Sequence, residues 1–187
     1  MYAVRHYRYQ PDEPQWRDHR RLTSVQLPQQ IRPWLLDRGS LTARLVRAGG
    51  GDFRVQVLEQ AWQRPRFTER RLLEMGDREQ GIIREVLLFC RGEPWVYARS
   101  VLPAQSLEGR LRHLRKLRDS ALGALLFSDP GMRRAPYEVA AIDGDSRLIP
   151  SAQRVDATLW GRRSCFYLSG LPIMVSEIFL PAFRPDA

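Results

Sequence analysis

Two arginines stand in two strongly apolar, strand-like segments of the chain. Arg84 lies in IIREVLL, residues 82–88, and Arg99 lies in WVYARSV, residues 95–101. If residues 91 and 94 pair across a two-residue loop, Arg84 and Arg99 point to the same face of the hairpin, within two rungs. Two guanidinium groups on one apolar face repel each other unless an anion or carboxylates lie between them. The spacing therefore has two interpretations. Either an anion or carboxylates lie between the two groups, or each arginine lies at a sheet margin with its head group in water, and these two segments alone favour the second.

A glutamate is the second chemically unusual residue. Glu177 is the only charged residue in LPIMVSEIFL, residues 171–180, which is apolar on both faces and is predicted to be a central strand. A lone buried carboxylate is unfavourable unless it is paired or protonated. Pairing across a Ser169-Gly170 turn would place Glu177 opposite Arg162. The glutamate is therefore either one half of a cross-strand ion pair or a carboxyl group that faces a ligand in a pocket.

The other candidate motifs are weak. The three histidines have no metal-ligand spacing, and the chain lacks CxxC. The glycines at 49–51 lack the Lys-Ser/Thr that follows a phosphate loop, so a flexible connection is expected. The basic stretch at 110–118 alternates with leucines and is typical of the solvated face of an amphipathic helix. None of these motifs therefore indicates a metal site or a phosphate-binding loop.

The elements that must position these residues follow from the apolar patterning. Two short helices are predicted at 28–36 and 41–47, a helical turn at 68–75, and a helical segment at 107–127 with a break near 119–120. Strands are predicted at 53–62, 82–90, 95–102, 137–142, 159–168 and 172–180. About six strands, mostly in hairpins, with two helical pairs inserted between them, predict an α+β domain on one antiparallel sheet.

The composition limits the classes of function. The chain has 187 residues, and its 30 lysines and arginines, of which only Lys116 is a lysine, against 21 aspartates and glutamates give a net charge of +9. This charge suggests nucleic acid, an anionic surface or an anionic substrate as the partner. The length predicts one domain over residues 1–187, in which residues 1–26 carry no clear pattern. We expect two buried free thiols at Cys90 and Cys165, with one disulfide as the alternative.

An internal similarity links the two helical pairs. LDRGSLTARL at 36–45 and LRDSALGALL at 117–126 share Leu, Leu, Ala and Leu at the same offsets, and each crosses a helix break. Leucine-rich helix pairs often look alike, so the similarity has two interpretations. It is either coincidental, or it marks two related helix-turn-helix covers on one sheet.

Taken together, these segments resemble bacterial chorismate lyases. REVLL at 84–88, GEPW at 92–95 and RSVLP at 99–103 resemble the family's central hairpin. LWGRRS at 159–164, LSG at 168–170 and EIFLP at 177–181 resemble its C-terminal hairpin. WLL at 34–36, SLT at 40–42, LG at 122–123 and LF at 126–127 fit its two helical flaps. The resemblance runs in order from about residue 27 to 181 and is poor over 1–26 and 132–155.

The resemblance implies a reaction and a set of site residues. The reaction is conversion of chorismate to 4-hydroxybenzoate and pyruvate without a cofactor, a first committed step towards ubiquinone, in a pocket beneath two flaps. Arg84 matches the arginine for the ring carboxylate, Glu177 the glutamate at the ring hydroxyl, and Arg99 a second arginine in the same pocket. Leu41 and Leu122 match flap positions that close over the ligand, although some family members carry Met in place of Leu41.

Two other functions are weighed against this one. A non-catalytic effector-binding module shares the general fold, but regulators of that type carry an additional DNA-binding domain, and about 27 unassigned residues are too few for one. A nucleic-acid binder would need arginines clustered with exposed aromatics, whereas here the arginines are spread through every segment. We therefore expect a monomer that binds chorismate and 4-hydroxybenzoate, without nucleic-acid binding or a membrane span. No signal peptide or apolar run of spanning length is seen, so we expect a cytoplasmic location.

Overall fold

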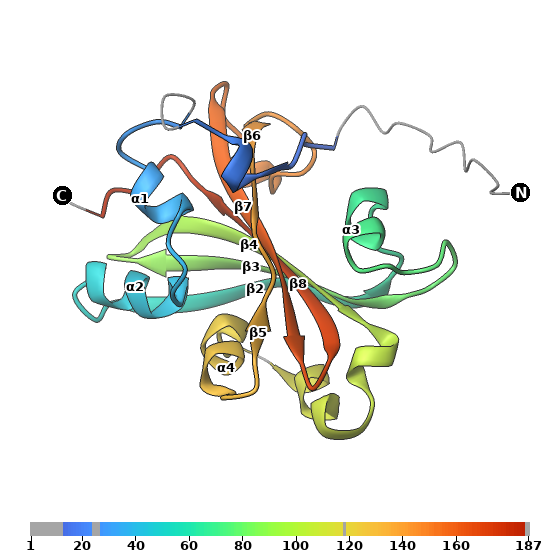
Figure 1. Cartoon of the computed structure of the whole chain (residues 1–187). Helices are drawn as coiled ribbons and strands as arrows, with labels where there is room; N and C mark the ends of the chain where they lie inside the picture. The colour runs from blue at the N-terminus through green and yellow to red at the C-terminus, as the bar shows by residue number, and fades with distance from the viewer. Residues whose placement is uncertain (1–12, 24–26, 118, 186–187) are drawn as a thin grey trace, which may run out of the picture.

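The computed structural model describes residues 13–23, 27–117 and 119–185. Within them, eight strands form one antiparallel sheet in the order β1-β6-β7-β8-β4-β3-β2, with β5 also paired to β7 (Figure 1). The long strands are β2 (Phe53–Gln63), β3 (Gly81–Cys90), β4 (Glu93–Pro103), β6 (Glu138–Asp143), β7 (Thr158–Leu168) and β8 (Leu171–Phe179). The strands β1 (Arg17–Asp18) and β5 (Arg133–Arg134) have two residues each. The predicted α+β class with about six strands is confirmed.

The hairpin of β7 and β8 folds as the sequence predicts. Ser169 and Gly170 form its two-residue loop with φ angles of 52° and 81°, the left-handed geometry that matches the twist of the strands. Leu168 pairs with Leu171, and the register continues to Arg162 opposite Glu177. The turn residues therefore determine the register of this pair of strands.

The hairpin of β3 and β4 departs from the prediction. Its loop is Arg91 and Gly92, again with positive φ angles of 52° and 76°, and not the predicted pair at 92–93. A β-bulge follows, because Phe89 pairs with Pro94 while Leu88 pairs with Val96. Proline has no N–H group for the ladder, so a bulge beside Pro94 is physically reasonable. The two differences together shift the register of the hairpin by one residue from the predicted one.

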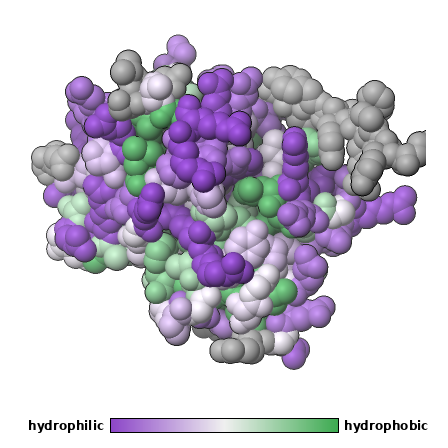
Figure 2. All heavy atoms as spheres, viewed as in Figure 1, coloured by the Kyte–Doolittle hydropathy of each residue, from purple (hydrophilic) through white to green (hydrophobic). Residues whose placement is uncertain are grey.

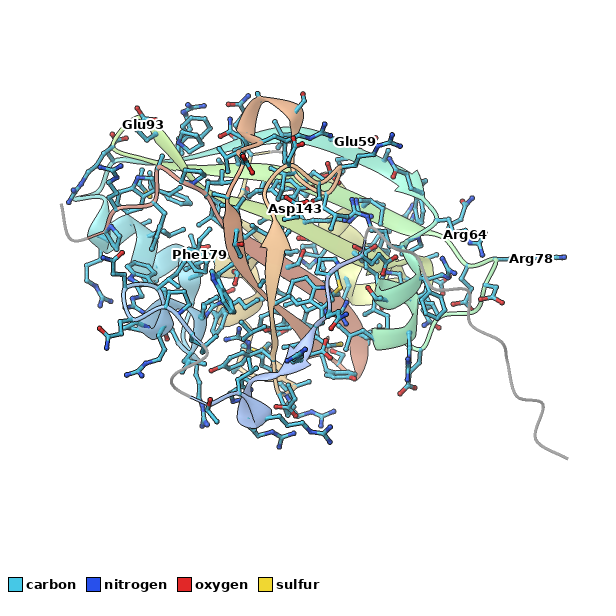
Figure 3. All side chains as sticks on the ribbon, turned by 90° about the horizontal axis from the view of Figure 1, so that it is seen from above. Glu59, Arg64, Arg78, Glu93, Asp143 and Phe179 are labelled. Carbon is cyan, nitrogen blue, oxygen red and sulfur yellow. The ribbon has the colours of Figure 1, made fainter. Side chains whose placement is uncertain are left out.

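Two helical flaps cover one face of the sheet, called the front face below. The first flap contains α1 (Arg32–Leu35) and α2 (Leu41–Ala48), and the Ser40 side chain caps α2 by accepting a hydrogen bond from the Ala43 amide at 3.3 Å. Its core includes Trp34, whose ring packs in a T-shaped arrangement with that of Phe179. Phe179, on β8, is labelled in Figure 3. The second flap contains η3 (Ala104–Leu107), η4 (Gly109–Lys116) and α4 (Leu122–Ser128).

The second flap is helical over most of the predicted segment 107–127, and its two parts are of different helix types. Its first part, η4, is a 3-10 helix, and only α4 is an α-helix. Leu111, Leu114 and Leu117 are buried, and their spacing of three residues matches the three residues per turn of a 3-10 helix. The predicted break near 119–120 does separate the two helices. Each flap therefore ends in a short α-helix, which begins at Leu41 in the first flap and at Leu122 in the second. The helix before it is an α-helix in the first flap and a 3-10 helix in the second.

The opposite face, called the rear face below, is covered by shorter elements. They are α3 (Phe67–Leu72), η5 (Ser151–Gln153) and the connections around them, whereas η1 (His19–Arg21) lies beside Tyr137. In Figure 1, α3 lies on the other side of the sheet from α1 and α2. The strand β1 adds to the edge of β6, so part of the unassigned segment 1–26 extends the sheet. The rest of that segment, at 1–12 and 24–26, lies outside the described residues.

Three further expectations can be compared with the structure. Cys90 and Cys165 are both buried and both free, which confirms the predicted thiols. In the part of the chain that is described, no helix is long and apolar enough to cross a membrane. The face viewed in Figure 2 is mostly hydrophilic, and its apolar side chains appear as separated patches. The arginines are accordingly dispersed over the surface and the interior alike.

Candidate functional site

A row of polar side chains crosses the front face of the sheet beneath the flaps. The strand register places Arg84 beside Ser100, Ser100 beside Val175, and Val175 beside Ser164. In the neighbouring row on the same face, Glu177 lies between Ala98 and Arg162. We call the polar members of these two rows the polar belt: Arg84, Ser100, Arg162, Ser164 and Glu177.

The belt separates two apolar clusters, one under each flap. On one side, Trp34, Leu35, Leu41 and Leu45 of the first flap pack on β3, β4 and β8. On the other side, six leucines of the second flap, from Leu107 to Leu126, pack on the opposite ends of the same strands and on β7. A cationic and polar strip enclosed by two apolar lids is a suitable environment for a small anionic ligand that must be kept from water.

Arg84 is one of the most deeply buried charged residues, with only 2% of its surface exposed. Its Nη2 group donates to the backbone carbonyl of Ser120, in the turn of the second flap, at 2.9 Å. Burial lowers the pKa of Arg84 and the charge of Asp119 opposes this, but a guanidinium group remains charged in proteins. The first site residue inferred from the sequence therefore carries a positive charge into the enclosed belt.

Glu177 and Arg162 form the cross-strand pair that the sequence predicts. Arg162 Nε donates to Glu177 Oε2 at 2.6 Å, and Arg162 is 1% exposed. The same arginine donates through Nη1 to the carbonyl oxygens of Trp34 and Asp37 at 2.9 and 2.7 Å. Arg162 therefore fixes the orientation of Glu177 and at the same time binds the backbone of the first flap. The ion-pair interpretation is confirmed, and the carboxylate still lies in the belt beneath the flaps.

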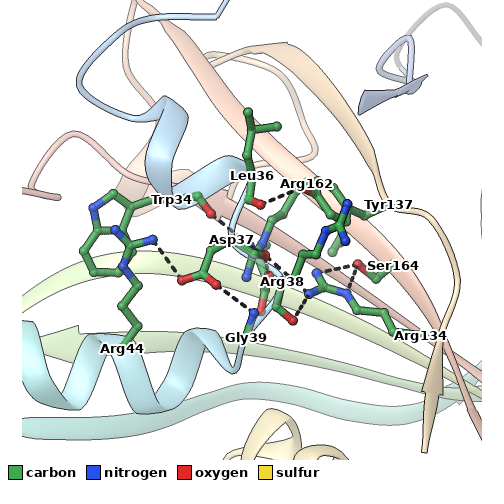
Figure 4. Close-up of polar contacts among 12 residues, drawn as sticks. Trp34, Leu36, Asp37, Arg38, Gly39, Arg44, Arg134, Tyr137, Arg162 and Ser164 are labelled. Carbon is green, nitrogen blue, oxygen red and sulfur yellow. Dashed lines mark hydrogen bonds and ion pairs between the residues drawn. The ribbon is translucent and has the colours of Figure 1, made fainter. Parts of the chain in front are cut away.

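The turn of the first flap is held by hydrogen bonds from the sheet (Figure 4). Besides Arg162, Tyr137 donates its hydroxyl to the Leu36 carbonyl at 2.7 Å. Arg134, on β5, donates through Nη1 to the Arg38 carbonyl at 3.1 Å. Its Nε and Nη2 groups both donate to Ser164 Oγ, at 2.9 and 2.7 Å. The guanidinium of Arg134 therefore lies at the end of the belt, beside the flap.

Leu41 and Leu122 occupy equivalent positions in the two flaps. Each is buried and is the first residue of its helix, α2 or α4, where the backbone N–H groups have no acceptor within the helix. The two helix starts meet, because a Cβ atom added at Gly123 would lie 3.0 Å from Thr42 Oγ1. The structure thus brings both predicted flap positions to the place where the flaps close over the belt.

Arg99 does not share this site, and the prediction that it faces the same way as Arg84 is wrong. In the observed register Arg84 lies opposite Ser100, so Arg99 lies opposite Glu85 on the rear face. The loop lies one residue earlier than predicted, and the bulge was not predicted. Together they shift the register by one residue, which moves a side chain to the other face of the sheet. The placement of Arg99 as a second arginine in the pocket is therefore not supported by the structure.

On the rear face, Arg99 belongs to a buried ion-pair cluster. Its guanidinium donates to Glu69 at 2.7 and 3.1 Å and to Glu85 at 2.6 Å. Burial alone would lower the pKa of Arg99, but the hydrogen bonds and charges of the two glutamates outweigh it and raise the pKa. Nearby, Arg163 lines an open cavity of about 620 Å³ and is paired with Glu138 at 2.6 Å. The positive charges of Arg99 and Arg163 therefore have carboxylate partners within the protein.

The sequence did not reveal the roles of Arg134 and Tyr137. Both lie within residues 132–155, where the resemblance to the family is poor. The only signal available there was an arginine pair at 133–134 before a short strand, and such pairs occur throughout this chain. Within the described residues, no group of three or more His, Cys, Asp or Glu side chains is arranged to hold a metal ion.

The fold is shared with the effector domains of bacterial transcription regulators. The effector domain of PhnF from Mycobacterium smegmatis matches 78% of this chain and 91% of its own length, with a TM-score of 0.53 and 15% identity. Full-length PhnF gives a TM-score of 0.52 at 14% identity, over 78% of this chain and 65% of its own length. At these identities the likeness establishes the fold alone.

The sequence comparison is more specific. Residues 11–184 match the family model of chorismate lyase. A Pseudomonas aeruginosa protein named "Probable chorismate pyruvate-lyase" is 41% identical over 154 residues, covering 82% of this chain and 85% of its own length. A protein of the same name from Azoarcus is 44% identical over 160 residues, covering 81% and 84%. The chain belongs to the chorismate lyase family.

Proposed function

We propose that this protein converts chorismate to 4-hydroxybenzoate and pyruvate. The observation that supports this best is the placement of Arg84 and Glu177 on one buried face, beneath two flaps that meet at Thr42 and Gly123, next to Leu41 and Leu122. Membership of the chorismate lyase family supplies the substrate, and the named relatives are described with the same activity. The entry of the product into ubiquinone synthesis, and a cytoplasmic location, belong to the same proposal.

The chemistry requires enclosure more than a strong nucleophile. The reaction breaks the C–O bond to the enolpyruvyl group and removes the hydrogen from the ring carbon that carries the hydroxyl, and the ring becomes aromatic. That hydrogen passes either directly to the enolpyruvyl methylene or through an acid or base. The protein must hold the enolpyruvyl arm over the ring and keep water out. The two apolar clusters beside the belt provide the dry walls.

Arg84 and Glu177 have distinct roles in this proposal. Arg84 binds the ring carboxylate, for which a planar guanidinium fork is well matched. Glu177, oriented by its 2.6 Å bond from Arg162, holds the ring hydroxyl and stabilises charge that shifts as the ether bond breaks. Proton transfer by Glu177 is a secondary role. The backbone amides at the starts of α2 and α4 lie where the flaps close, so Leu41 and Leu122 contact the ligand.

The enclosure also predicts slow product release. Arg84 donates to the turn of the second flap and Arg162 to that of the first, so both flaps are bonded to the belt. A product held by Arg84 and Glu177 leaves only when the flaps open, which makes flap opening rate-limiting. A pre-steady-state burst of 4-hydroxybenzoate and inhibition by added product are the expected results. Absence of both contradicts slow release.

The direct experiment is to incubate the purified protein with chorismate in the presence of a metal chelator. Chromatography identifies the aromatic product, and a coupled lactate dehydrogenase assay measures the pyruvate. We expect equal amounts of 4-hydroxybenzoate and pyruvate. Binding of chorismate without turnover would contradict the proposal and indicate an effector-binding domain. A hydroxybenzoate isomer as the product would retain the lyase class and change its specificity.

A further inference from the structure

The Arg134 side chain reaches, from β5, the far end of the row of the sheet that begins at Arg84. The row runs from Arg84 on β3 through Ser100 and Val175 to Ser164 on β7, and the Ser164 hydroxyl accepts two hydrogen bonds from Arg134. Neighbouring strands lie about 4.8 Å apart, so the Cα atoms of Arg84 and Ser164 are roughly 14 Å apart, and the Arg134 guanidinium is bonded to the Ser164 hydroxyl. Both arginine side chains extend several ångströms, so a small molecule on this row can reach both guanidinium groups.

The partners of Arg134 differ from those of the other arginine at this end of the belt. Arg162 is matched by the carboxylate of Glu177. Arg134 donates to the Ser164 hydroxyl and to the carbonyl oxygens of Asp37 and Arg38, and within the described residues no carboxylate lies within 4.0 Å of it (Figure 4). Burial and the neighbouring charge of Arg162 lower the pKa of Arg134, and the charges of Glu177 and Asp37 offset this only in part. Among the described residues, this cation therefore has no carboxylate in direct contact.

The proposed substrate carries two carboxylates, and the rear-face position of Arg99 removes the second arginine expected from the sequence. Arg84 accounts for the ring carboxylate, and Arg162 is paired with Glu177. We propose that Arg134 binds the enolpyruvyl carboxylate of chorismate. This inference rests on the proposed function and adds the residue that distinguishes the dianionic substrate from the product. 4-Hydroxybenzoate has a single carboxylate, so Arg134 has no anion to bind once pyruvate has left.

The competing explanation is that Arg134 only fastens the first flap, through its bond to the Arg38 carbonyl. Tyr137 offers a matched control, because its hydroxyl also donates to the flap turn, at the Leu36 carbonyl, but carries no charge. If Arg134 only fastens the flap, its loss weakens the binding of every ligand that the closed flap retains. If Arg134 binds a carboxylate of the substrate, its loss weakens chorismate binding and leaves 4-hydroxybenzoate binding almost unchanged.

The test compares Arg134→Met, Arg134→Lys and Tyr137→Phe with the wild type. Steady-state kinetics with chorismate give KM and kcat, and calorimetry with 4-hydroxybenzoate gives Kd. We expect Arg134→Met to raise the KM for chorismate about 10- to 100-fold, while the product Kd changes by less than about 3-fold. Arg134→Lys, which keeps the charge, recovers part of the loss. Tyr137→Phe shifts both constants by a similar factor.

Two results would overturn the inference. If Arg134→Met weakens the binding of chorismate and of 4-hydroxybenzoate equally, Arg134 only fastens the flap. If it weakens the binding of neither ligand, Arg134 has no part in binding. Product binding reports that each variant is folded, and Arg134→Gln, which keeps a donor for Ser164, replaces the methionine variant if that does not fold. Failure of the wild type to release pyruvate from chorismate would instead refute the proposed function, and the inference with it.

Discussion

The two faces of the sheet use buried arginines in opposite ways. On the rear face, Arg99 is surrounded by the carboxylates of Glu69 and Glu85, which raise its pKa. On the front face, burial lowers the pKa of Arg84 and Arg134; Arg84 donates to the Ser120 carbonyl, and Arg134 donates to the Arg38 carbonyl and the Ser164 hydroxyl. Arg84 and Arg99 lie on adjacent strands, one pair apart in the register.

This contrast shows how to distinguish a structural arginine from one that serves a ligand. A buried cation that is paired with carboxylates has its counter-ions within the protein, so removing either partner mainly lowers the stability of the fold. A buried cation that donates to neutral oxygens keeps the capacity to bind an anion more strongly than its present acceptors. The sequence presents both as single arginines in apolar strands. The following predictions test whether the distinction holds.

The largest effect is expected at Arg84. Arg84→Met should lower kcat/KM for chorismate on the order of 10³-fold and abolish measurable 4-hydroxybenzoate binding, because truncating one partner of a buried charge pair costs about 2–5 kcal/mol. Calorimetry and initial rates measure the two quantities. Unchanged affinity for 4-hydroxybenzoate in this variant would remove Arg84 from the ligand site.

The matched change on the rear face is Arg99→Met, which should act on stability. It leaves Glu69 and Glu85 without their common cation, so we expect the free energy of unfolding to fall by about 3–5 kcal/mol, with the 4-hydroxybenzoate Kd within about 3-fold of the wild type. Urea unfolding and calorimetry provide the measurements. A variant of normal stability that no longer binds chorismate would return Arg99 to the substrate site.

A smaller and more specific effect is expected at Glu177. Glu177→Gln should lower kcat about 10²-fold with a modest change in KM, because the amide cannot stabilise charge or accept a proton as a carboxylate does. Loss of the ion pair to Arg162 also lowers stability, so unfolding must be measured on the same sample. Full kcat with only a raised KM would exclude a chemical role for Glu177.

The smallest effect is expected in the acid stability of the rear cluster. Burial alone would raise the pKa of Glu69, but the hydrogen bonds and charge of Arg99 outweigh it, and the pKa lies below its usual value of 4.5. The resulting stabilisation is present above pH 4.5 and is lost as the pH falls through the lowered pKa. Glu69→Gln lacks this contribution, so its unfolding free energy should decline less steeply below pH 4.5 than that of the wild type. Urea titrations at pH 7 and at about pH 3.5 measure the difference, and equal slopes would contradict it.

Much of the fold and part of the site followed from local sequence signals. The strands and their hairpin partners are encoded by alternating apolar residues and by turn residues, so the ion pair of Arg162 with Glu177 was predicted from the Ser169-Gly170 turn. The flap helices were also located, because Ser40 is a good cap and the leucines mark their buried faces. The helical segment of the second flap was located without its helix type, and its leucine spacing of three matches the 3-10 helix observed there.

The sequence by itself determined which residue types lie in the sheet, the basic charge, and the family to which the chain belongs. Only the tertiary structure decided which face each arginine occupies. A bulge and a displaced loop move Arg99 to the rear face, and a two-residue strand, β5, places Arg134 at the end of the belt. Local patterns do not encode these facts, because a bulge depends on how two strands fit together and β5 depends on its pairing with β7. The charge of the chain indicated an anion, and the packing of the sheet determined where that anion binds.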